Sequence, residues 1–348
     1  MNATLNAAPE AAKGAAPVGV VLVNWNRWAD TIEALESLLR STVPVRVVVV
    51  DNASADGSFE RIAAWAAGRE PAAAASAPMA RLSTPALAKP IALRRIAPDE
   101  AGTAELGAED WLTLVDSGGN LGFAGGNNVG LRLLQTDPAV EIFWLLNNDT
   151  VVEADTAALL GARMLAEPRV GMCGTVVRYY WHPDRVQALN GHRLSWWTGT
   201  SKGINHGLSP EVAFDARQVA RETDFVLGAS LAVSRAFLET VGPMEESYFL
   251  YFEEADWAAR NAGRFGIGFA AGAVVFHKEG GSIGSSGVPG ARSEMSDYWL
   301  ARSRLAFIRR HRPLLWPWHW LFSGALMARR LVRGQPAKAK SIWKAMTE

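Results

Sequence analysis

The sequence holds a single cysteine, Cys173, among its 348 residues, and its formal net charge is +0. A lone cysteine excludes an intrachain disulfide framework and any zinc site built from several cysteines, and it fits a reducing compartment. We expect Cys173 to be a small residue of the core. The balanced charge argues against a protein that binds nucleic acid through its overall charge, so we expect no nucleic-acid partner.

Long apolar runs are also missing, since none reaches the roughly 18 to 20 residues of a membrane-spanning helix. Residues 1–16 are rich in alanine and lack the basic start and the continuous apolar core of a signal peptide. We therefore expect a disordered tail over residues 1–16 and no export. The hydrophobic content of 49% is nevertheless that of a globular chain with a sizeable core.

Buried strands alternate with helices in the first part of the chain. The stretches 18–23 and 45–50 are continuous apolar, β-branched runs, and each is followed by polar residues and then by helical spacing over 29–39 and 59–67. This alternation is typical of a doubly wound α/β sheet. Between residues 69 and 110 the composition shifts to alanine and proline, so we expect an insertion on the surface there.

The remainder of the chain continues the same pattern. An irregular region rich in Trp, His and Gly is expected over 179–219, and Ser234 is the expected cap of a helix that follows the strand before it. Further strands are predicted at 111–115, 144–146, 170–177, 224–233 and 272–276, with helices at 127–134 and 153–166.

The strand that ends at Leu146 is followed directly by Asn147, Asn148 and Asp149. Such a strand end delivers a carboxylate and two amides to the edge of the sheet, where ligands of α/β proteins bind. Oxygen ligands of this kind suit Mg2+ or Mn2+, which leave their other positions to water and substrate phosphates. The alternative is an ordinary turn or helix cap, since Asn and Asp favour both.

A glycine-rich stretch over 116–130 contains six glycines. Its backbone N–H groups could approach a ligand closely, and the predicted helix would add a positive N-terminal end for a phosphate or another polar group. The alternative is a loop that only closes a strand onto a helix. Neither G-x-G-x-x-G nor G-x-x-x-x-G-K-[ST] occurs in this chain, which weakens a dehydrogenase or P-loop interpretation.

Three carboxylates, Glu253, Glu254 and Asp256, follow the aromatic run 248–252. Acidic residues are favourable at the N-terminus of a helix, but an apolar wall beside them can raise a carboxyl pKa towards that of a general base. His277 ends the last predicted strand, and a single histidine there is more often structural than a ligand. The stretch 278–287 is expected to be flexible, and one interpretation of it is a lid.

The C-terminal segment is strongly basic, with eleven Lys or Arg between Ala301 and Glu348 against the single acid Glu348. Aromatic residues next to a basic cluster suit a helix that lies in the surface of an anionic membrane, here through residues 313–333. The alternative is a helix that packs on the α/β domain with solvated arginines. The residues concerned are Trp316, Trp318, Trp320, Phe322, Arg329, Arg330 and Arg333.

Taken in order, these strand-end motifs resemble the family 2 glycosyltransferases, in particular the bacterial rhamnosyltransferase-like branch with the GT-A fold. The resemblance covers roughly Val18 to Ser282. It implies an α/β protein of GT-A type, with a Rossmann-like, mostly parallel sheet flanked by helices over residues 17–300. A helical extension over 301–348 would follow this domain.

The resemblance also implies roles for particular residues. The family's Asn-Leu-Gly-Phe-x-x-Gly-x-Asn stretch matches residues 120–128, and its metal motif falls on 147–149. Donor contacts are thereby implied for Val23, Asn24, Trp25, Asn26, Asp51, Asn52, Asn120, Gly122, Phe123, Gly126, Asn128 and Asn148, metal ligation of Mg2+ or Mn2+ for Asp149 and His277, and an acceptor-side position for Gly228 and Ala229.

The family's acceptor-side Glu-Asp-x-Asp pattern matches residues 253–256, and its catalytic base occupies the second of these positions. This sequence has Glu254 where the family usually has Asp, so the resemblance leaves either Glu254 or its neighbour Glu253 as the base. Asp256 completes the implied catalytic group. Glutamate is one methylene longer than aspartate and can perform the same proton transfer.

The implied function is metal-dependent, inverting transfer of a sugar, rhamnose in the resembling branch, from a dTDP- or UDP-sugar to a hydroxyl of a cell-surface glycan or lipid-linked acceptor. The implied location is the cytoplasm, including the cytoplasmic face of the inner membrane. Two alternatives stay open: a sugar nucleotidyltransferase, whose usual glycine- and lysine-bearing loop is replaced here by residues 24–27, and a non-catalytic nucleotide-sugar-binding protein.

Overall fold

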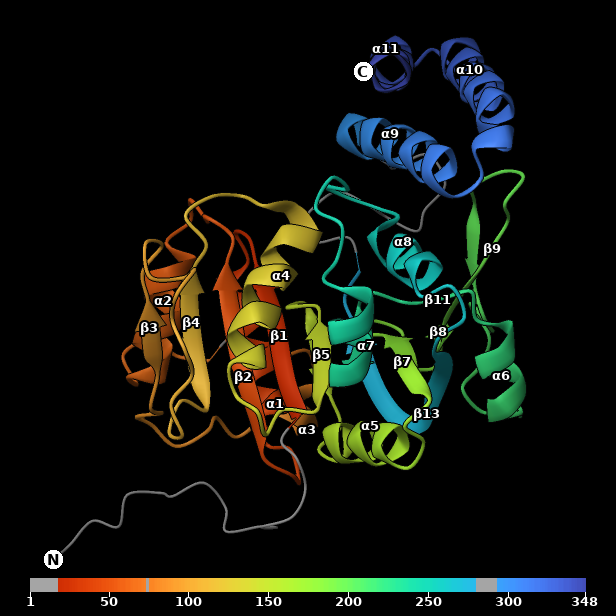
Figure 1. Cartoon of the computed structure of the whole chain (residues 1–348). Helices are drawn as coiled ribbons and strands as arrows, with labels where there is room; N and C mark the ends of the chain where they lie inside the picture. Colours follow the sequence, from red (N-terminus) through yellow and green to blue (C-terminus); the bar gives the residue numbers. More distant parts are fainter. Residues whose placement is uncertain (1–17, 73–74, 280–292) are drawn as a thin grey trace, which may run out of the picture.

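The computed structural model describes residues 18–72, 75–279 and 293–348 (Figure 1). The tail 1–16, expected to be disordered, lies outside the described residues, as does most of the stretch 278–287 that was considered as a lid. A large mixed sheet with helices on both faces forms the body of the molecule, and three helices at the C-terminal end lie together beside it.

Ten strands form the main sheet of the described chain. They are β1 (Val18–Asn24), β2 (Val45–Asp51), β3 (Arg94–Ile96), β4 (Leu112–Asp116), β5 (Ile142–Leu146), β6 (Thr150–Val152), β7 (Val170–Tyr179), β8 (Val186–Leu189), β12 (Ser230–Ser234) and β13 (Gly266–His277). Their order is β3-β4-β2-β1-β5-β12-β7-β13-β6, with β8 paired to β7. The five neighbouring strands β3, β4, β2, β1 and β5 are parallel, whereas β12 runs antiparallel between β5 and β7. The predicted mostly parallel α/β sheet is confirmed.

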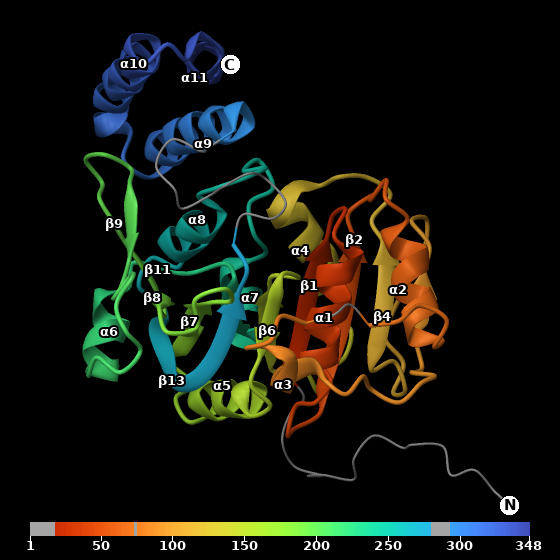
Figure 2. The same cartoon turned by 180° about the vertical axis from the view of Figure 1, so that it is seen from behind.

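Helices cover both faces of this sheet, as Figures 1 and 2 show from opposite sides. Helices α1 (Trp28–Leu38), α2 (Ser58–Ala66) and α5 (Thr156–Leu165) contribute to the hydrophobic cluster on one face. Helices α4 (Gly122–Gln135), α7 (Arg235–Val241) and α8 (Glu253–Arg260) contribute to the cluster on the other. The short helices α3 (Ala80–Ser83) and α6 (Ala216–Glu222) lie at the periphery.

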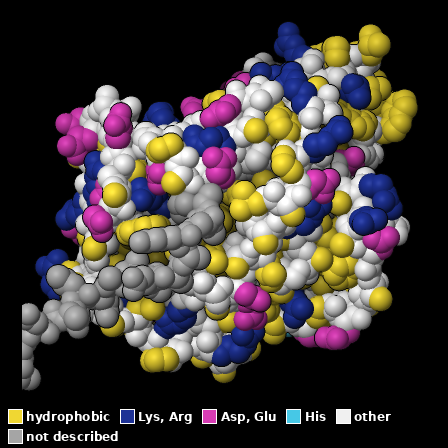
Figure 3. All heavy atoms as spheres, turned by 60° about the horizontal axis from the view of Figure 1, so that its bottom comes forward, with side chains coloured by type: hydrophobic (Ala, Val, Ile, Leu, Met, Phe, Trp, Pro, Cys, Tyr) yellow, Lys and Arg dark blue, Asp and Glu magenta, His cyan; other side chains and the backbone are white. Residues whose placement is uncertain are grey.

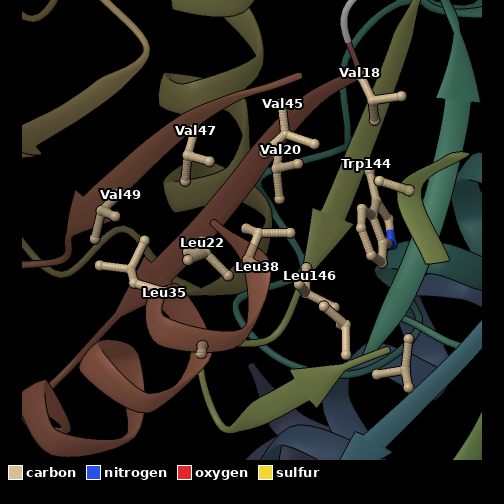
Figure 4. Close-up of a cluster of buried hydrophobic side chains, with 14 of the residues drawn as sticks. Val18, Val20, Leu22, Leu35, Leu38, Val45, Val47, Val49, Trp144 and Leu146 are labelled. Atoms are coloured by element: carbon tan, nitrogen blue, oxygen red, sulfur yellow. The ribbon is translucent and has the colours of Figure 1, made fainter. Parts of the chain in front are cut away.

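The alternation of side chains along β1 explains why its sequence is apolar throughout. Val18, Val20 and Leu22 belong to the cluster beneath α1, together with Trp144 of β5 (Figure 4). Val21, one residue out of phase, belongs to the cluster beneath α4. Successive strand residues face opposite sides of a sheet, so a central parallel strand with helices on both sides must be apolar on both.

The C-terminal helices pack on a small second sheet. That sheet consists of β9 (Gly191–Leu194), β10 (Ser201–Gly203) and β11 (Phe225–Val226), and the helices are α9 (Glu294–His311), α10 (Trp316–Val332) and α11 (Pro336–Thr347), with the 3-10 turn η1 (Pro313–Leu315) before α10. The ring of Trp196, after β9, stacks on Phe307 of α9 at 5.2 Å, and its carbonyl accepts a hydrogen bond from His319 of α10. None of the described helices is both long and apolar enough to cross a bilayer.

Several elements differ from the sequence prediction. The segment 69–110, expected as a surface insertion, contributes the edge strand β3, whose two arginines hide it from a search for apolar runs. The region 179–219, expected to be irregular, contains β8, β9, β10 and α6. The single strand predicted over 224–233 is two strands, β11 and β12, because the chain turns at 227–229 between two different sheets.

Helix α4 begins at Gly122, five residues before the predicted start at Asn127. Glycine disfavours helices, which hides this start in the sequence. The glycines are used for close packing on β1, since a Cβ added to Gly126 or Gly130 would lie 2.8 Å from Val23 Cγ1 or 2.5 Å from Val21 Cγ1. Much of the glycine-rich stretch is therefore a helix pressed onto a strand.

Gly130→Ala is expected to destabilise the protein by about 1 to 3 kcal/mol, because the added methyl overlaps Val21 in a packed core. Gly324→Ala in α10 is the matched control, since a Cβ there meets nothing within 4 Å. The control should be neutral or stabilising by up to about 1 kcal/mol, which is the gain in helix propensity. Urea denaturation of the two variants measures both values, and equal stability of the two would contradict the close contact.

Candidate active site

A cavity of about 1190 Å³ lies where the carboxyl ends of β1, β2 and β5 meet the start of α8 and the C-terminal helices. Large clefts at the carboxyl ends of parallel strands are the usual ligand sites of α/β proteins. The sequence-predicted residues that line it are Val23, Trp25, Asn52, Asn120, Gly122, Phe123, Asn148, Asp149, Glu254 and His277.

The strand ends are joined by a buried network centred on Asn24. Its Nδ2 donates to Asp51 Oδ1 at 2.7 Å, and its Oδ1 accepts from Thr31 at 2.8 Å and from Asn148 Nδ2 at 3.2 Å. Asp51 also accepts from the Ser54 hydroxyl at 2.6 Å. These groups fix the ends of β1, β2 and β5 relative to one another, and Asn24 and Asp51 lie behind the cavity wall.

A second amide pair closes the wall beside the glycine-rich stretch. Asn52 Nδ2 donates to Asn120 Oδ1 at 3.2 Å and to the Gly122 carbonyl at 3.0 Å, and Asn52 Oδ1 accepts from Leu121 N at 3.1 Å. Gly122 has φ of +70°, and a Cβ there would lie 2.6 Å from the Phe249 carbonyl. A side chain at Gly122 would therefore collide with the loop that leads to α8.

Other predicted residues do not line the cavity. Asn128 is held by Met244 and Glu246, and Asn26 by Ala55, so their amides serve local structure. The predicted residues that do not line the cavity are Asn24, Asn26, Asp51, Gly126, Asn128, Gly228, Ala229, Glu253 and Asp256.

Asp149 and His277 form a close pair in the cavity. His277 Nε2 lies 3.1 Å from Asp149 Oδ1, and the other ring nitrogen, Nδ1, lies 2.8 Å from Gln187 Oε1. Strand β13 ends at His277, and the Lys278 N–H donates to the Asp149 carbonyl at 3.0 Å, which binds the two segments together. Sequence reasoning missed Gln187 because it lies on β8, in the region expected to be irregular.

The two groups of this pair shift each other's pKa. Burial by itself raises the pKa of Asp149, but the charge and hydrogen bond of His277 outweigh it and leave that pKa below its usual value. Burial by itself lowers the pKa of His277, but the charge and hydrogen bond of Asp149 outweigh burial and leave that pKa above its usual value. An ionised carboxylate is thus stabilised in the lining of the cavity.

The pair has the donor chemistry of a divalent-cation site. With its Nδ1–H donated to Gln187, His277 would present Nε2 beside the Asp149 carboxylate, and this is the usual arrangement of a metal-bound histidine. Within the described ranges, no group of three or more His, Cys, Asp or Glu could hold a metal ion. A cation bound here would take its remaining ligands from water and substrate, as Mg2+ and Mn2+ do at phosphate sites.

Glu253 and Glu254 form a second titratable pair at the start of α8. Burial, followed by the charge of Glu254, raises the pKa of Glu253 well above its usual value. Burial also raises the pKa of Glu254, while the side chain of Glu253 and the backbone of Gly228 hydrogen-bond to it. This arrangement suits a neutral Glu253 that donates to an ionised Glu254. Only Glu254 of the two lines the cavity.

A side chain at Gly228 would displace the Glu254 carboxylate, since a Cβ there would lie 2.2 Å from Glu254 Oε1. The approach to α8 is also conformationally restrained: Tyr251 and Phe252 have φ of +66° and +73°. Positive φ is rare for bulky residues and costs about 1 to 3 kcal/mol at each. The loop thus holds Glu254 against the cavity at the expense of local stability.

Asp256 has a different environment from the two glutamates. Burial opposes its ionisation, but hydrogen bonds from His311 at 2.7 Å and Arg260 at 2.8 Å hold the pKa of Asp256 below its usual value. Its oxygens are directed at these partners, and Asp256 is outside the cavity lining. The geometry assigns Asp256 to anchoring α8 against α9.

Comparisons with known proteins extend these observations. No family model matches the chain. The chain is similar to the low-salt glycan biosynthesis hexosyltransferase Agl10 of Haloferax volcanii, with 24% identity over 183 residues, 47% of this chain and 51% of that protein. The chain thus spans about half the length of the curated relative it matches.

Two solved structures share the fold over nearly the whole chain. The mannosyltransferase PcManGT from Pyrobaculum calidifontis, in complex with GDP-Man and Mn2+, aligns with a TM-score of 0.50 and 16% identity, covering 95% of this chain and 86% of that one. GalNAc-T7 with UDP, GalNAc and Mn2+ aligns with a TM-score of 0.53 and 12% identity, covering 96% and 55%. The expected GT-A fold is thereby confirmed.

Glu253→Gln is expected to stabilise the protein at neutral pH and to have little effect at about pH 4, close to the pKa of an unfolded glutamate. The folded-state pKa of Glu253 is raised, so its contribution to stability is full below the unfolded pKa and is lost as the pH rises through the folded pKa. Glutamine copies the neutral acid and lacks this dependence. Thermal denaturation over this pH range measures the effect.

The control for this substitution is Glu109→Gln, at an exposed glutamate, which should change stability little at any pH. A Glu253→Gln effect that is the same at acidic and neutral pH would contradict a neutral, buried Glu253.

Proposed function

We propose, from the GT-A fold, that this protein is a metal-dependent, inverting glycosyltransferase that moves a hexose from a nucleotide-sugar to a hydroxyl. The observation that carries the proposal is the presence of the Asp149–His277 pair and of Glu254 in the lining of one cavity at the carboxyl ends of the strands. The similarity to a hexosyltransferase supports the same class of reaction.

The donor is proposed to bind between β1, β2 and α4. Trp25 and Asn52 line this part of the cavity together with Phe123. The two GT-A structures were determined with GDP-Man or UDP and with Mn2+, which supports a nucleotide-sugar and a divalent cation as ligands here. From the resemblance to the rhamnosyltransferase-like branch we propose dTDP or UDP as the nucleotide and rhamnose as the sugar.

Asp149 and His277 are proposed to hold the cation. The imidazole nitrogen suits Mn2+ better than Mg2+, which prefers oxygen ligands alone. When bound, the cation would neutralise charge on the leaving nucleoside diphosphate. Asn147 Nδ2 lies 3.3 Å from His277 Nε2, so this amide would have to turn aside for Nε2 to bind the cation.

Glu254 is proposed as the general base. The neutral Glu253 beside it would leave Glu254 as the ionised partner. The raised pKa of Glu254 makes this carboxylate a stronger base, closer to what proton transfer near neutral pH needs. Glu254 would take the proton of the acceptor hydroxyl while that oxygen attacks the anomeric carbon and the diphosphate leaves from the opposite face. One such displacement inverts the anomeric configuration.

The C-terminal helices are proposed to touch a membrane surface peripherally through residues 313–333. Leu314 of η1 is 94% exposed, and Leu321 and Val332 of α10 are 62% and 90% exposed. Large apolar residues exposed in one region indicate a contact surface. Figure 3 shows apolar and basic side chains interspersed over these helices at the upper right. This arrangement suits an anionic bilayer and an acceptor that is lipid-linked or part of a cell-surface glycan.

Glu254→Gln is expected to lower the transfer rate by roughly 10²- to 10⁴-fold, the usual contribution of a general base, while donor binding persists. Asp149→Ala should instead abolish metal-dependent donor binding, and Asn147→Ala should have a smaller effect. Nucleoside diphosphate release from a panel of nucleotide-sugars with Mn2+, together with calorimetric donor binding, separates the three effects.

Glu109→Gln is again the control and should keep full activity. Full activity of Glu254→Gln would refute the assignment of the base. Pyrophosphate release from a sugar phosphate and a nucleoside triphosphate would point to a nucleotidyltransferase, and donor binding without turnover in the wild type would point to a binding protein.

Replacing Leu321 and Val332 by glutamine is expected to weaken binding to vesicles that contain phosphatidylglycerol, because both side chains are exposed on α10. The matched control is Leu165→Gln on α5, where the leucine is 49% exposed but lies far from the C-terminal helices. Cosedimentation at low and high salt measures binding, which should fall as salt rises. Equal loss in the control and the double variant would contradict a specific contact surface.

A further inference from the structure

The cavity extends from the proposed catalytic groups into the C-terminal helices, where α10 presents one stripe of side chains to it. Phe322, Leu326, Arg329, Arg330 and Arg333 all line the cavity. Their spacing of three and four residues places them on one face of a helix. The stripe is therefore apolar at one end and cationic at the other.

Helix α9 faces this stripe with a similar mixture of side chains. Trp299, Leu300 and Arg304 line the same part of the cavity. Arg304 Nη2 donates to Ser323 Oγ of α10 at 2.7 Å, and Arg330 Nη2 of α10 donates to Asp297 Oδ1 of α9 at 2.8 Å. These two links join the antiparallel helices α9 and α10 beside the cavity.

Arg304 is a buried cation without an anion. Only 6% of the residue is exposed, and a Cβ on Gly199 would lie 2.4 Å from its Cδ. Its guanidinium stands 5.1 Å from the centre of the Phe322 ring, but Nε has no hydrogen-bond partner and no carboxylate pairs with it among the residues described. Burial lowers the pKa of Arg304 to about 10.

A buried guanidinium in this condition is unusual, because burying a charge is unfavourable unless an opposite charge or a full set of hydrogen bonds compensates for it. The neighbouring Arg330 illustrates the contrast, since it has Asp297 as its partner. Arg329 and Arg333 are exposed at the rim of the cavity, where they add positive potential. An anion that enters the cavity would supply the charge that Arg304 lacks.

We propose that this part of the cavity is the acceptor subsite and that it binds a phosphate ester carried on an apolar chain, with the phosphate on Arg304 and the chain against Phe322, Leu326 and Trp299. The inference rests on the proposed transferase function, because it gives the acceptor of that reaction its chemical class. Arg329 and Arg333 would attract the ligand, and the phosphate would orient the acceptor sugar towards Glu254.

The side chains present select this ligand over simpler ones. A neutral oligosaccharide would leave the charge of Arg304 uncompensated, and a bare phosphate would leave the apolar wall without a partner. A guanidinium binds phosphate through directed, charge-assisted hydrogen bonds, and aromatic and aliphatic side chains bind an alkyl or prenyl chain by burial. One amphiphilic anion satisfies both halves of the subsite.

The test is calorimetric binding of farnesyl phosphate to the full chain, without donor and with EDTA, so that a failure of metal-dependent donor chemistry cannot affect it. The wild type should bind farnesyl phosphate more tightly than inorganic phosphate or farnesol. Arg304→Met should weaken this binding about tenfold or more, as expected for the loss of a charge-assisted hydrogen bond. Its melting temperature should stay the same or rise, because the substitution removes a buried, unpaired charge.

The double variant Arg329→Ala with Arg333→Ala keeps the test independent of the folding of Arg304→Met, since both residues are exposed. It should weaken farnesyl phosphate binding and reduce the salt dependence of the affinity. The matched control is Arg309→Ala, at an exposed arginine of α9 outside the cavity, which should bind as the wild type does.

Two outcomes would overturn the proposal. One is a wild type that binds farnesyl phosphate no better than inorganic phosphate or farnesol, and the other is an Arg304→Met variant that folds and binds with wild-type affinity. Binding to phosphatidylglycerol vesicles separates a membrane headgroup from a single-chain acceptor. The Arg304→Met variant should bind these vesicles as the wild type does. If the variant instead lost vesicle binding and kept farnesyl phosphate binding, Arg304 would be assigned to the membrane.

Discussion

The structure depends on the in-register parallel pairing of β1 with its two neighbours. Val18 pairs with Val45 on one side and with Ile142 on the other, so all three strands end at the same edge of the sheet. The buried hydrogen bonds of Asn24 to Asp51 and Asn148 then fix these ends. A slip of one residue in this register would break the network and turn each side chain to the opposite face.

At this edge, later parts of the chain add the groups that we propose to be reactive. Strand β13 brings His277 back to Asp149, and the restrained turn at Tyr251 and Phe252 brings Glu254 to the same cavity. The two clusters differ in protonation: the pKa of Asp149 is lowered by its histidine, whereas the pKa of Glu254 is raised by burial. A stabilised anion and a more basic carboxylate thus share one cavity, which is the arrangement that the proposed metal-assisted proton transfer needs.

Much of this arrangement could be predicted from the sequence, because it follows from local patterns. The apolar runs followed by Asn24, Asp51 and Asn147 mark strands whose ends carry polar groups, and the alternation of strands and helices indicates a mostly parallel α/β sheet. The role of the glycines in α4 could not be predicted, since the sequence does not say which strand a helix will press against. Gln187 and Arg304 carry no local signal either. Gln187 matters through His277, which lies 90 residues further along the chain, and Arg304 matters because its Nε is buried without a hydrogen-bond partner.

The sequence also left the choice between Glu253 and Glu254 open, and our proposal of Glu254 rests on its place in the cavity lining and on the strongly raised pKa of Glu253. The central claim is that a cation bound by Asp149 and His277 shares that cavity with Glu254. The most direct measurement is anomalous diffraction at the manganese edge from crystals soaked with Mn2+ and a nucleoside diphosphate. A peak between Asp149 and His277 is predicted, and a peak elsewhere, or none at that position with the nucleotide bound, would contradict the claim.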